Sequence, residues 1–301
     1  MRFSLIIPLA PSREIKIIES INKLNYPKES FEVIVKEGLN PSVNRNNGIK
    51  EAKGEIIGFL DDDAIVHSEI LIEVDKFFKE NPLHQIVGGP QLNTKNETFF
   101  GKYSGYTLAS FFGTMSMSTR YKKTPLNLNA NENHLTSANL FVKKKVFDKI
   151  KGFDPDLFPG EDPEFLARAK KNGFKIASSP NIIIYHKRRG TPKAFSKQLF
   201  NYGKTRLQKE KKNQTKPSPI FYTPALFVIY LILLIPISFV STLFLLPLLM
   251  YFVISVLFSV QITVEHKDPL AVLFTPFIFL LLHISYGVGM LRFIGINFKA
   301  N

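Results

Sequence analysis

The stretch GEIIGFLDDDAIV, from Gly54 to Val66, decides the fold class of this chain. Its apolar run ends on three consecutive aspartates, Asp61, Asp62 and Asp63. Carboxylates this close together repel one another, so the cluster disfavours folding unless solvent or a cation compensates for the charge. The stretch therefore predicts a buried strand that delivers three acidic side chains to its end.

The surrounding sequence alternates strand and helix patterns. Short apolar runs suit buried parallel strands at Ser4–Leu9, Phe31–Val35 and Glu55–Leu60. Between them, helical spacing predicts helices over Ser12–Asn25 and Ser42–Ala52, the second of which is predicted to be capped by Ser42. This βαβαβ order predicts an α/β fold with a doubly wound, mostly parallel sheet, whose ligands bind beyond the carboxyl ends of the strands.

Two interpretations of the three aspartates follow from their position. They form a solvated loop before a helix that starts near Ser68, or they form a site for a hard cation. Mg²⁺ and Mn²⁺ prefer oxygen ligands and commonly bind one or two carboxylates together with substrate phosphates. The ligand-binding end of the sheet favours the cation site, where a metal stabilises the charge of a departing diphosphate.

A second carboxylate cluster lies in FDPDLFPGEDPEFLARAKKNGF, from Phe153 to Phe174. Asp162 before Pro163 predicts a helix N-cap, and Gly173 predicts the end of that helix. A carboxylate at the positive end of a helix is also suited to act as a general base. The motif by itself leaves both roles open for Asp162.

A histidine follows a further apolar run. Ile182–Tyr185 is predicted to be a strand that delivers His186 to its end. There the imidazole is a candidate third metal ligand or diphosphate contact, and a structural role is the alternative.

The positive charge of the chain is concentrated in one place. Of a formal net charge of +14, residues 187–216 contribute eleven Lys and Arg against the single Glu210. A basic segment directly before an apolar tail is typical of attraction to anionic lipid headgroups. No zinc-finger spacing or RNA-recognition signature accompanies it, which argues against nucleic acid as a partner. The absence of cysteine excludes disulfides and thiolate metal sites.

The tail from Ile220 onward holds few ionisable side chains, and about twenty apolar residues suffice to cross a bilayer. Pro236 and Pro247 disfavour one long helix here. A first pair of helices that forms a shallow hairpin is the alternative to three full crossings. The predicted spans are Ile220–Val240, Ser241–Val260 and Leu270–Ile294, with the loop Glu265–Asp268 inside.

Four separated pieces of the chain resemble the inverting glycosyltransferases of family 2, which have the GT-A fold. They are SLIIP at Ser4–Pro8, VNRNNGI at Val43–Ile49, FLDDD at Phe59–Asp63 and GEDPEF at Gly160–Phe165. The resemblance covers roughly Phe3 to Arg206. Relatives that act on lipid-linked acceptors commonly carry a membrane tail of a few spans.

The resemblance also implies roles for individual residues. Asp63 would be the chief metal ligand, Asp61 a second contact to metal and nucleotide, and Asp62 a contact to the nucleoside. Asp162 would be the catalytic base. Further donor-binding positions implied by the resemblance are Pro8, Arg45, Asn139 and Glu161.

Two stretches depart from the family pattern. Many relatives carry an Asp-Asp-Gly-Ser stretch after the second strand, where VIVKEGLNPS offers only Glu37 for nucleoside recognition. The segment QLFNY, from Gln198 to Tyr202, is similar to the Gln-x-x-Arg-Trp motif of processive members, but Asn201 and Tyr202 replace the Arg and Trp. Gln198 and Tyr202 are predicted to line the acceptor end of the site, with a purely interfacial anchor helix as the alternative.

One aromatic segment has no assigned role at this stage. Phe99–Tyr121 is crowded with Phe, Tyr and Met residues. Its pattern fits a core segment and equally a lid that lies on the bilayer.

Together the sequence predicts a metal-dependent glycosyltransferase that uses Mn²⁺ or Mg²⁺. It would transfer a sugar, with inversion, from a nucleotide-diphosphate sugar to a hydroxyl of a polyprenyl-linked acceptor among the membrane lipids. The predicted parts are a catalytic domain at 1–190, a basic interfacial segment at 191–216 and a membrane region at 217–301. The expected location is the cell membrane, multi-pass, with the catalytic domain facing the cytoplasm.

Two other functions are weighed against this one. A polyprenyl-phosphate sugar synthase is the enzymatic alternative, although DDDAIVHSEI lacks the Asp-Leu-Gln-His-Pro-like stretch of its relatives. The other is a catalytically inactive, membrane-anchored nucleotide-binding scaffold.

Overall fold

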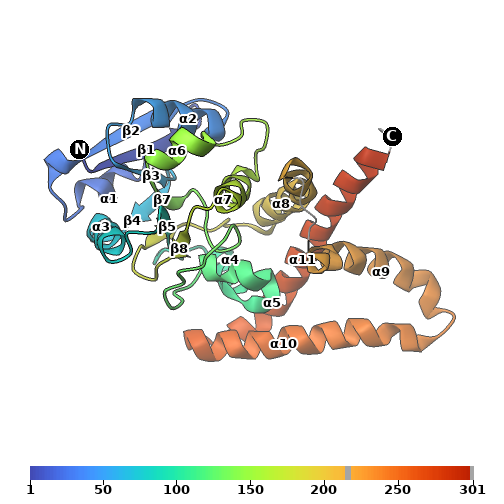
Figure 1. The fold of residues 1–301 in the computed structure, drawn as a ribbon. Coiled ribbons are helices and arrows are strands. Elements are labelled where there is room, and N and C mark those ends of the chain that lie inside the picture. The colour runs from blue at the N-terminus through green and yellow to red at the C-terminus, as the bar shows by residue number, and fades with distance from the viewer. Residues whose placement is uncertain (214–217, 299–301) are drawn as a thin grey trace. The chain divides into compact units, whose positions relative to one another are not determined.

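The computed structural model describes residues 1–213 and 218–298 and divides into two compact units (Figure 1). Unit 1 comprises Met1–Lys95 and Thr119–Lys187, and unit 2 comprises Asn96–Ser118 and the chain from Arg188 onward. The chain thus passes from unit 1 into unit 2, returns to unit 1 and then continues in unit 2. The ends of the predicted interfacial segment and of the membrane region, at 214–216 and 299–301, lie outside the described residues.

Unit 1 is built on a six-stranded sheet in the order β2-β1-β3-β7-β5-β8. β1 pairs in parallel with β2 and β3, β5 pairs in parallel with β8, and β7 runs antiparallel to both β3 and β5. The predicted doubly wound, mostly parallel sheet is therefore confirmed. Its strands are β1 (Phe3–Leu9), β2 (Phe31–Glu37), β3 (Ile56–Leu60), β5 (Ile86–Gly88), β7 (Asn139–Lys143) and β8 (Ile176–Ser178).

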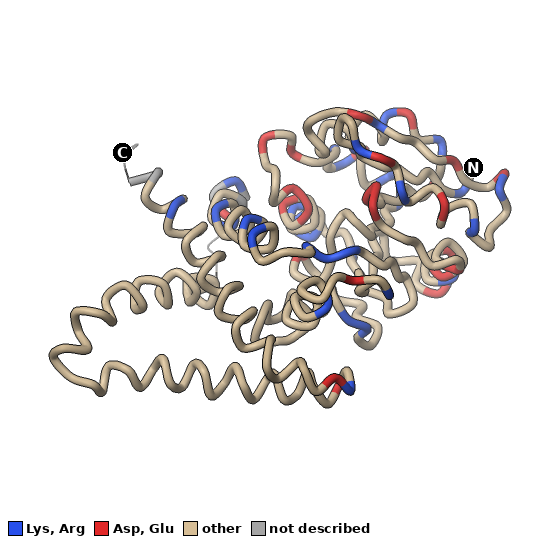
Figure 2. The backbone as a smooth tube through the Cα atoms, turned by 180° about the vertical axis from the view of Figure 1, so that it is seen from behind, with Lys and Arg blue, Asp and Glu red and all other residues tan. Residues whose placement is uncertain are grey.

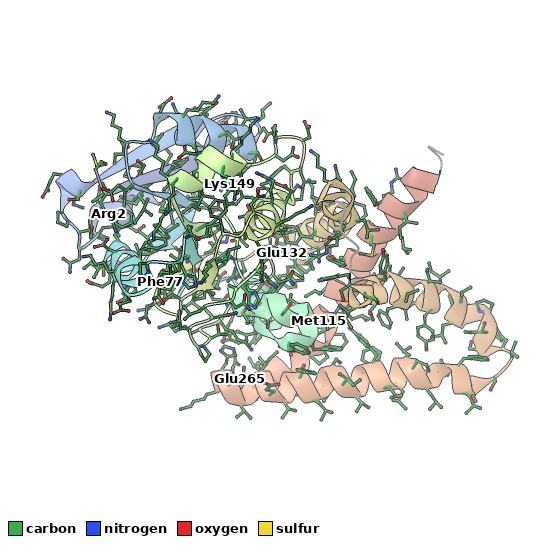
Figure 3. The ribbon with its side chains drawn as sticks, in the orientation of Figure 1. Arg2, Phe77, Met115, Glu132, Lys149 and Glu265 are labelled. Carbon is green, nitrogen blue, oxygen red and sulfur yellow. The ribbon has the colours of Figure 1, made fainter. Side chains whose placement is uncertain are left out.

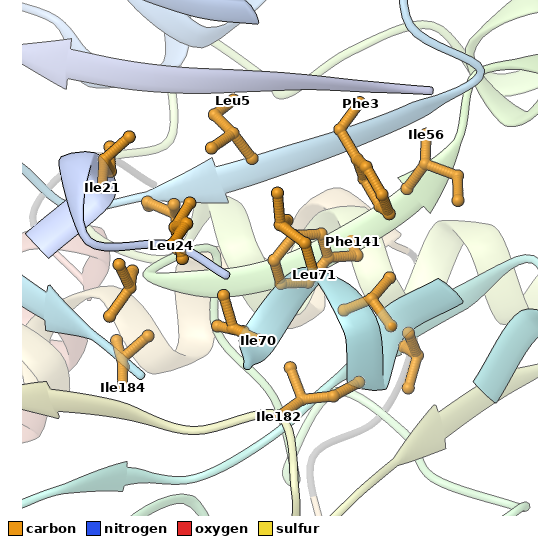
Figure 4. Close-up of a cluster of buried hydrophobic side chains, with 14 of the residues drawn as sticks. Phe3, Leu5, Ile21, Leu24, Ile56, Ile70, Leu71, Phe141, Ile182 and Ile184 are labelled. Atoms are coloured by element: carbon orange, nitrogen blue, oxygen red, sulfur yellow. The ribbon is translucent and has the colours of Figure 1, made fainter. Parts of the chain in front are cut away.

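Alternating side chains of the strands build a core on each face of this sheet. Phe3, Leu5 and Ile7 of β1 are buried in one cluster, and Ile6 is buried in the other. Figure 4 shows the first cluster, which includes residues of α1 and α3. Residues of α6 and α7 belong to the second. The helices of unit 1 are α1 (Ile18–Asn22), α2 (Pro41–Glu51), α3 (Ile70–Glu80), α6 (Lys145–Ile150) and α7 (Glu161–Lys171), with a 3-10 turn η1 (Lys28–Ser30).

The predicted helix over Ser12–Asn25 is mostly wrong, because α1 contains only Ile18–Asn22. The backbone N–H groups of Lys16 and Ile17 donate to the carbonyl of Asp62, at 2.9 and 3.0 Å. These long-range bonds hold residues before α1 in a loop against the end of β3, so they cannot join a helix.

Two predicted helix caps are also wrong. Asn40, not Ser42, caps α2, because its Oδ1 accepts from the N–H groups of Ser42 and Val43 at 3.0 and 3.3 Å. α7 begins at Glu161 after Gly160, so Asp162 is its second residue and not its cap. Gly173, with φ of +83°, ends α7 as predicted.

A second, three-stranded sheet lies in unit 1 in the order β4-β9-β6. β4 and β9 are antiparallel, and their register places Ala64 opposite His186. His186 is thereby brought next to Asp63 although more than a hundred residues separate them. The strands are β4 (Ala64–Val66), β6 (Gln91–Leu92) and β9 (Ile184–His186).

Unit 2 is helical in its described part. Three of its helices are long and apolar enough to cross a membrane, as predicted, over Pro219–Ser238, Thr242–His266 and Ala271–Gly295. The second extends past the predicted end at Val260, so Glu265 and His266 belong to the helix and not to the loop. Unit 2 contains α4 (Phe99–Ala109), α5 (Phe111–Thr114), α8 (Pro192–Asn213), α9 (Thr223–Ser238), α10 (Leu246–His266) and α11 (Ala271–Phe298), with 3-10 turns η3 (Pro219–Tyr222) and η4 (Thr242–Leu245). The 3-10 turn η2 (Met115–Arg120) begins in unit 2 and ends in unit 1.

The helices of unit 2 differ in their content of charged side chains. Basic residues, blue in Figure 2, lie along α8. The hairpin of α9 and α10 carries no Lys, Arg, Asp or Glu before its end at residues 265–268. Side chains of α9 and α10 project from the ribbon (Figure 3), and only 11% of each of these two candidate spans is buried. Glycines let α8 approach α11 closely, because a Cβ on Gly289 would lie 2.0 Å from the carbonyl oxygen of Phe200.

Candidate active site

The candidate site lies where the strand order of the main sheet reverses. β1 is followed in the chain by β2 on one side and later by β3 on its other side. Asp61, Asp62 and Asp63 follow β3 directly, at its carboxyl end. This is the edge at which doubly wound sheets bind their ligands.

Asp61, Asp63 and His186 form a group that could hold a metal ion. One donor atom from each side chain lies within 4.8 Å of the other two. Nε2 of His186 is 2.8 Å from Oδ1 of Asp63 and 3.9 Å from Oδ2 of Asp61. Two carboxylates and an imidazole suit Mn²⁺, and the carboxylates also suit Mg²⁺. The donor set therefore fits the predicted cofactor.

The carboxylates of this group differ in their pKa. Burial alone would raise the pKa of Asp63, but the hydrogen bond with His186 and the charges of His186 and Arg13 lower it below its ordinary value. Burial raises the pKa of Asp61 above its ordinary value, which the charge of Arg45 only partly offsets. Asp63 is thus held ionised, as a metal ligand must be.

Arg13 is a site residue that the sequence did not reveal. Its Nη2 lies 2.8 Å from Oδ2 of Asp63, and its Nε lies 3.0 Å from Oδ2 of Asp62. The guanidinium compensates for part of the repulsion among the aspartates. A predicted helix over Ser12–Asn25 concealed this role, because Arg13 lies in the loop that the hydrogen bonds to Asp62 create.

Asp62 differs from its two neighbours in its surroundings. The residue is 4% exposed, and its carboxylate faces Arg13. Its backbone carbonyl holds the loop before α1. The predicted contact of Asp62 to the nucleoside stays a prediction.

Arg45 links α2 to the start of α7. It is 5% exposed, so its side chain does not lie on the solvent-facing surface of α2. Its Nη1 donates to Oε1 of Glu161 at 2.9 Å, and its Nη2 lies 3.4 Å from Oδ1 of Asp61. Arg45 therefore joins one of the metal-group carboxylates to the carboxylates of α7.

Glu161 is buried beside a like charge. Burial and the neighbouring Asp162 raise its pKa to about 8, although Arg45 acts in the opposite direction. Oε2 of Glu161 accepts from the N–H of Gly160 at 3.0 Å. Its contacts join α7 to Arg45, and its predicted contact to the donor stays a prediction.

Asp162 has a free buried acceptor. Among the described residues, its Oδ1 has no hydrogen-bond partner although the atom is buried. Asp162 follows Glu161, whose partner Arg45 also contacts Asp61 of the metal group. Buried polar atoms normally have hydrogen-bond partners, and this carboxylate oxygen is an exception; the catalytic role of Asp162 stays a prediction.

The remaining predicted residues of unit 1 lie near the same edge of the sheet. Asn139 pairs with Leu60, the last residue of β3, and its amide donates to the carbonyl of Ile182 at 2.8 Å. Pro8 and Glu37 lie near the carboxyl ends of β1 and β2, where Pro8 is buried and Glu37 is exposed. Their ligand contacts stay predictions.

Gln198 and Tyr202 belong to unit 2. On α8, Nε2 of Gln198 donates to the hydroxyl of Tyr202 at 3.1 Å. Lys193, Lys197 and Lys204 of the same helix are exposed. The acceptor-lining role of Gln198 and Tyr202 stays a prediction.

These features define a class of fold that comparison with solved structures supports. The chain resembles the mannosyltransferase PcManGT from Pyrobaculum calidifontis, solved with GDP-Man and Mn²⁺, with a TM-score of 0.59 and 13% identity over 97% of this chain and 87% of that one. The fold is thus of the GT-A type.

The sequence comparisons then identify the family. The model of glycosyltransferase-like family 2 matches residues 13–203, and the chain belongs to this family. A glycosyltransferase, AglE, from Haloferax volcanii is 24% identical over 60% of this chain and 55% of its own length. A dolichyl N-acetyl-α-D-glucosaminyl phosphate 3-β-D-2,3-diacetamido-2,3-dideoxy-β-D-glucuronosyltransferase from Methanococcus voltae is 27% identical over 45% of this chain and 40% of its own. The chain spans about half the length of these curated relatives.

Proposed function

We propose that this protein is a metal-dependent, inverting glycosyltransferase of membranes. It transfers a glycosyl group from a nucleotide-diphosphate sugar to a hydroxyl of a polyprenyl-linked saccharide. The observation that carries this proposal is the Asp61, Asp63 and His186 group at the carboxyl edge of a GT-A sheet. A divalent cation bound there would neutralise the charge that develops on the leaving diphosphate.

Asp162 is the general base of the proposed reaction. Its free Oδ1 takes the proton of the acceptor hydroxyl while the hydroxyl oxygen forms a bond to the anomeric carbon. The bond from that carbon to the diphosphate breaks, and the diphosphate leaves with the electron pair. A single displacement from the opposite face inverts the anomeric configuration.

Arg45 positions the carboxylates for this step. Its hydrogen bond to Glu161 and its contact with Asp61 connect the two acidic clusters. The guanidinium of Arg45 interacts with three acidic side chains, so it limits their mutual repulsion in the absence of substrate. These side chains are Asp61, Glu161 and Asp162.

The membrane acceptor is supported by two features. Unit 2 offers three helices that are long and apolar enough to cross a bilayer, preceded by the basic helix α8. The relative from Methanococcus voltae is named for a dolichyl-phosphate-linked acceptor. The basic side chains of α8 would place unit 1 on the cytoplasmic side, by the excess of Lys and Arg in cytoplasmic segments.

The experiment that tests this function compares Asp162→Asn with Asp156→Asn, an exposed aspartate in the loop before α7. Donor binding is measured by calorimetry with UDP-, GDP- and dTDP-sugars and Mn²⁺, and transfer is measured as sugar incorporated into polyprenyl-linked lipid. Asp162→Asn should lose transfer and keep donor binding, and Asp156→Asn should keep both.

Three other outcomes would change the conclusion. Full transfer by Asp162→Asn would remove this residue from the base role. A product formed on polyprenyl phosphate itself would instead identify a polyprenyl-phosphate sugar synthase. Donor binding by the unaltered protein without transfer to any acceptor would favour the inactive nucleotide-binding scaffold.

A further inference from the structure

The aromatic segment Phe99–Thr114 packs against the apolar helices of unit 2. At its start, the ring of Phe99 lies 4.8 Å from that of Phe274 in the first turn of α11. Near its middle, Tyr106 stacks on His266 at the end of α10, with ring centroids 3.8 Å apart. α4 therefore begins at the level of the loop that joins α10 to α11.

Polar contacts fix α4 at this level. Asp268 in the loop pairs with Nζ of Lys102 at 2.5 Å and accepts from the hydroxyl of Tyr103 at 3.3 Å. Asp268 is 8% exposed. Lys102, the one charged side chain in Phe99–Thr114, thus lies at the end of the candidate spans, where headgroups and water would lie.

The far end of the segment reaches well along both helices. The ring of Phe112 lies 5.3 Å from Phe258 of α10, and 5.0 and 5.1 Å from Phe279 and His283 of α11. Phe258 precedes His266 by eight residues, and His283 follows Ala271 by twelve. At 1.5 Å per helical residue, the tip lies roughly 12 to 18 Å from the loop, close to half of a hydrocarbon core of about 30 Å.

Threonine hydroxyls of this segment donate to backbone carbonyls within it, as hydrocarbon requires of buried polar groups. The hydroxyl of Thr107 donates to the carbonyl of Tyr103 at 2.8 Å, and that of Thr114 donates to Leu108 at 2.7 Å. Where the helix breaks after α4, the carbonyl of Phe112 would otherwise lack a partner within the helix.

His283 supplies that partner. Its Nε2 lies 3.1 Å from the carbonyl oxygen of Phe112, and its Nδ1 lies 2.8 Å from the hydroxyl of Tyr251 on α10. Donation from Nε2 to the carbonyl leaves Nδ1 to accept from the tyrosine. One imidazole in the middle of a candidate span therefore fastens α5 to both α10 and α11.

We propose that Phe99–Thr114 is a re-entrant segment that enters the bilayer and returns on the same side. Both of its ends lead into unit 1, through Lys95 and Thr119, and its helices are too short to cross. The segment's partner is the hydrocarbon of the lipid chains. At the tip of the segment, formed by Phe111 and Phe112, the side chain of Phe111 is 56% exposed, and lipid would cover it. Figure 3 marks Met115, just after this tip, and Glu265 near the end of α10. The proposal does not depend on glycosyl transfer.

The chain contains no tryptophan, so one substitution gives a unique fluorophore. Phe111→Trp is compared with Leu257→Trp on α10, at the same distance along the spans, and with Phe158→Trp in unit 1. These three side chains are 56%, 63% and 58% exposed, so none of the changes removes a buried contact. The full chain is reconstituted into phosphatidylcholine vesicles with bromine at shallow or deep acyl positions.

The expected result is that deep bromines quench Phe111→Trp as strongly as Leu257→Trp, with aqueous iodide quenching neither. Phe158→Trp should show the reverse. Quenching of Phe111→Trp by iodide and by no brominated lipid would overturn the proposal. Quenching by shallow bromines only would also overturn it, because the segment would then lie at the surface as a lid.

A second variant tests whether the hydrogen bonds of His283 hold α5 against α10 and α11. His283→Leu in the Phe111→Trp background should shift quenching from the deep to the shallow bromines. Phe111→Cys in the cysteine-free chain gives an independent measure, since a membrane-impermeant maleimide should label it only after His283→Leu. Labelling of Phe111→Cys with His283 intact would contradict burial in the bilayer.

Discussion

Glu161→Gln removes a carboxyl group that is buried next to Asp162 and changes how stability depends on pH. Burial and Asp162 raise the pKa of Glu161 from 4.5 to about 8. The folded protein therefore binds this proton more tightly than the unfolded chain does. The resulting stability is fully present below pH 4.5 and is lost as the pH rises through about 8.

The magnitude follows from the linkage between proton binding and folding. Between these two pKa values the group contributes a slope of about 1.4 kcal/mol per pH unit. For a folded part of the size of unit 1, this free-energy slope corresponds to a change of about 3 to 6 °C in melting temperature per pH unit. Glutamine cannot ionise, so the stability of Glu161→Gln relative to the unaltered protein should increase from pH 5 to pH 7.5. Its retained amide oxygen can still accept from Arg45.

The assay is circular dichroism melting in detergent from pH 5 to pH 8, with EDTA present so that no metal binds the aspartates. Glu19→Gln is the matched control, because Glu19 is exposed and its hydrogen bond with Lys23 lowers its pKa. Glu19 stays ionised over the whole range and should leave the pH dependence unchanged. Parallel pH profiles for Glu161→Gln and the unaltered protein would refute the reasoning.

Two further changes test other contacts of the structure. Arg13→Ala removes the cation that faces Asp63 at 2.8 Å, so it should raise the affinity for Mn²⁺ alone, by up to about fivefold for a contact worth at most about 1 kcal/mol. Calorimetry measures this, and weaker Mn²⁺ binding would contradict it. Gly289→Ala should destabilise unit 2 by about 1 to 3 kcal/mol, because its new Cβ would lie 2.0 Å from a carbonyl oxygen of α8. Gly295→Ala has open space and should not; equal melting temperatures for the two variants would count against close packing of α8 on α11.

Local pattern was sufficient for much of the fold. The first three strands and the three apolar helices are runs of apolar residues whose length and spacing are visible in the chain. The aspartates after β3 indicated the edge of the sheet at which the candidate site lies, because ligands of a doubly wound sheet bind beyond the carboxyl ends of its strands. Pattern failed for Ser12–Asn25, where helical spacing was present but the carbonyl of Asp62 took the N–H groups of Lys16 and Ile17.

The sequence by itself determined the alternation of strands and helices in the first βαβαβ unit, the family motifs and the apolar tail, because these depend on residues close together in the chain. Only the tertiary structure decided which distant side chains meet. The antiparallel register of β4 and β9 brings His186 to Asp63, and the hydrogen bond from Arg45 to Glu161 joins α2 to the start of α7. Contacts over more than a hundred residues leave no periodic signal, since they depend on how separate elements pair and not on local spacing.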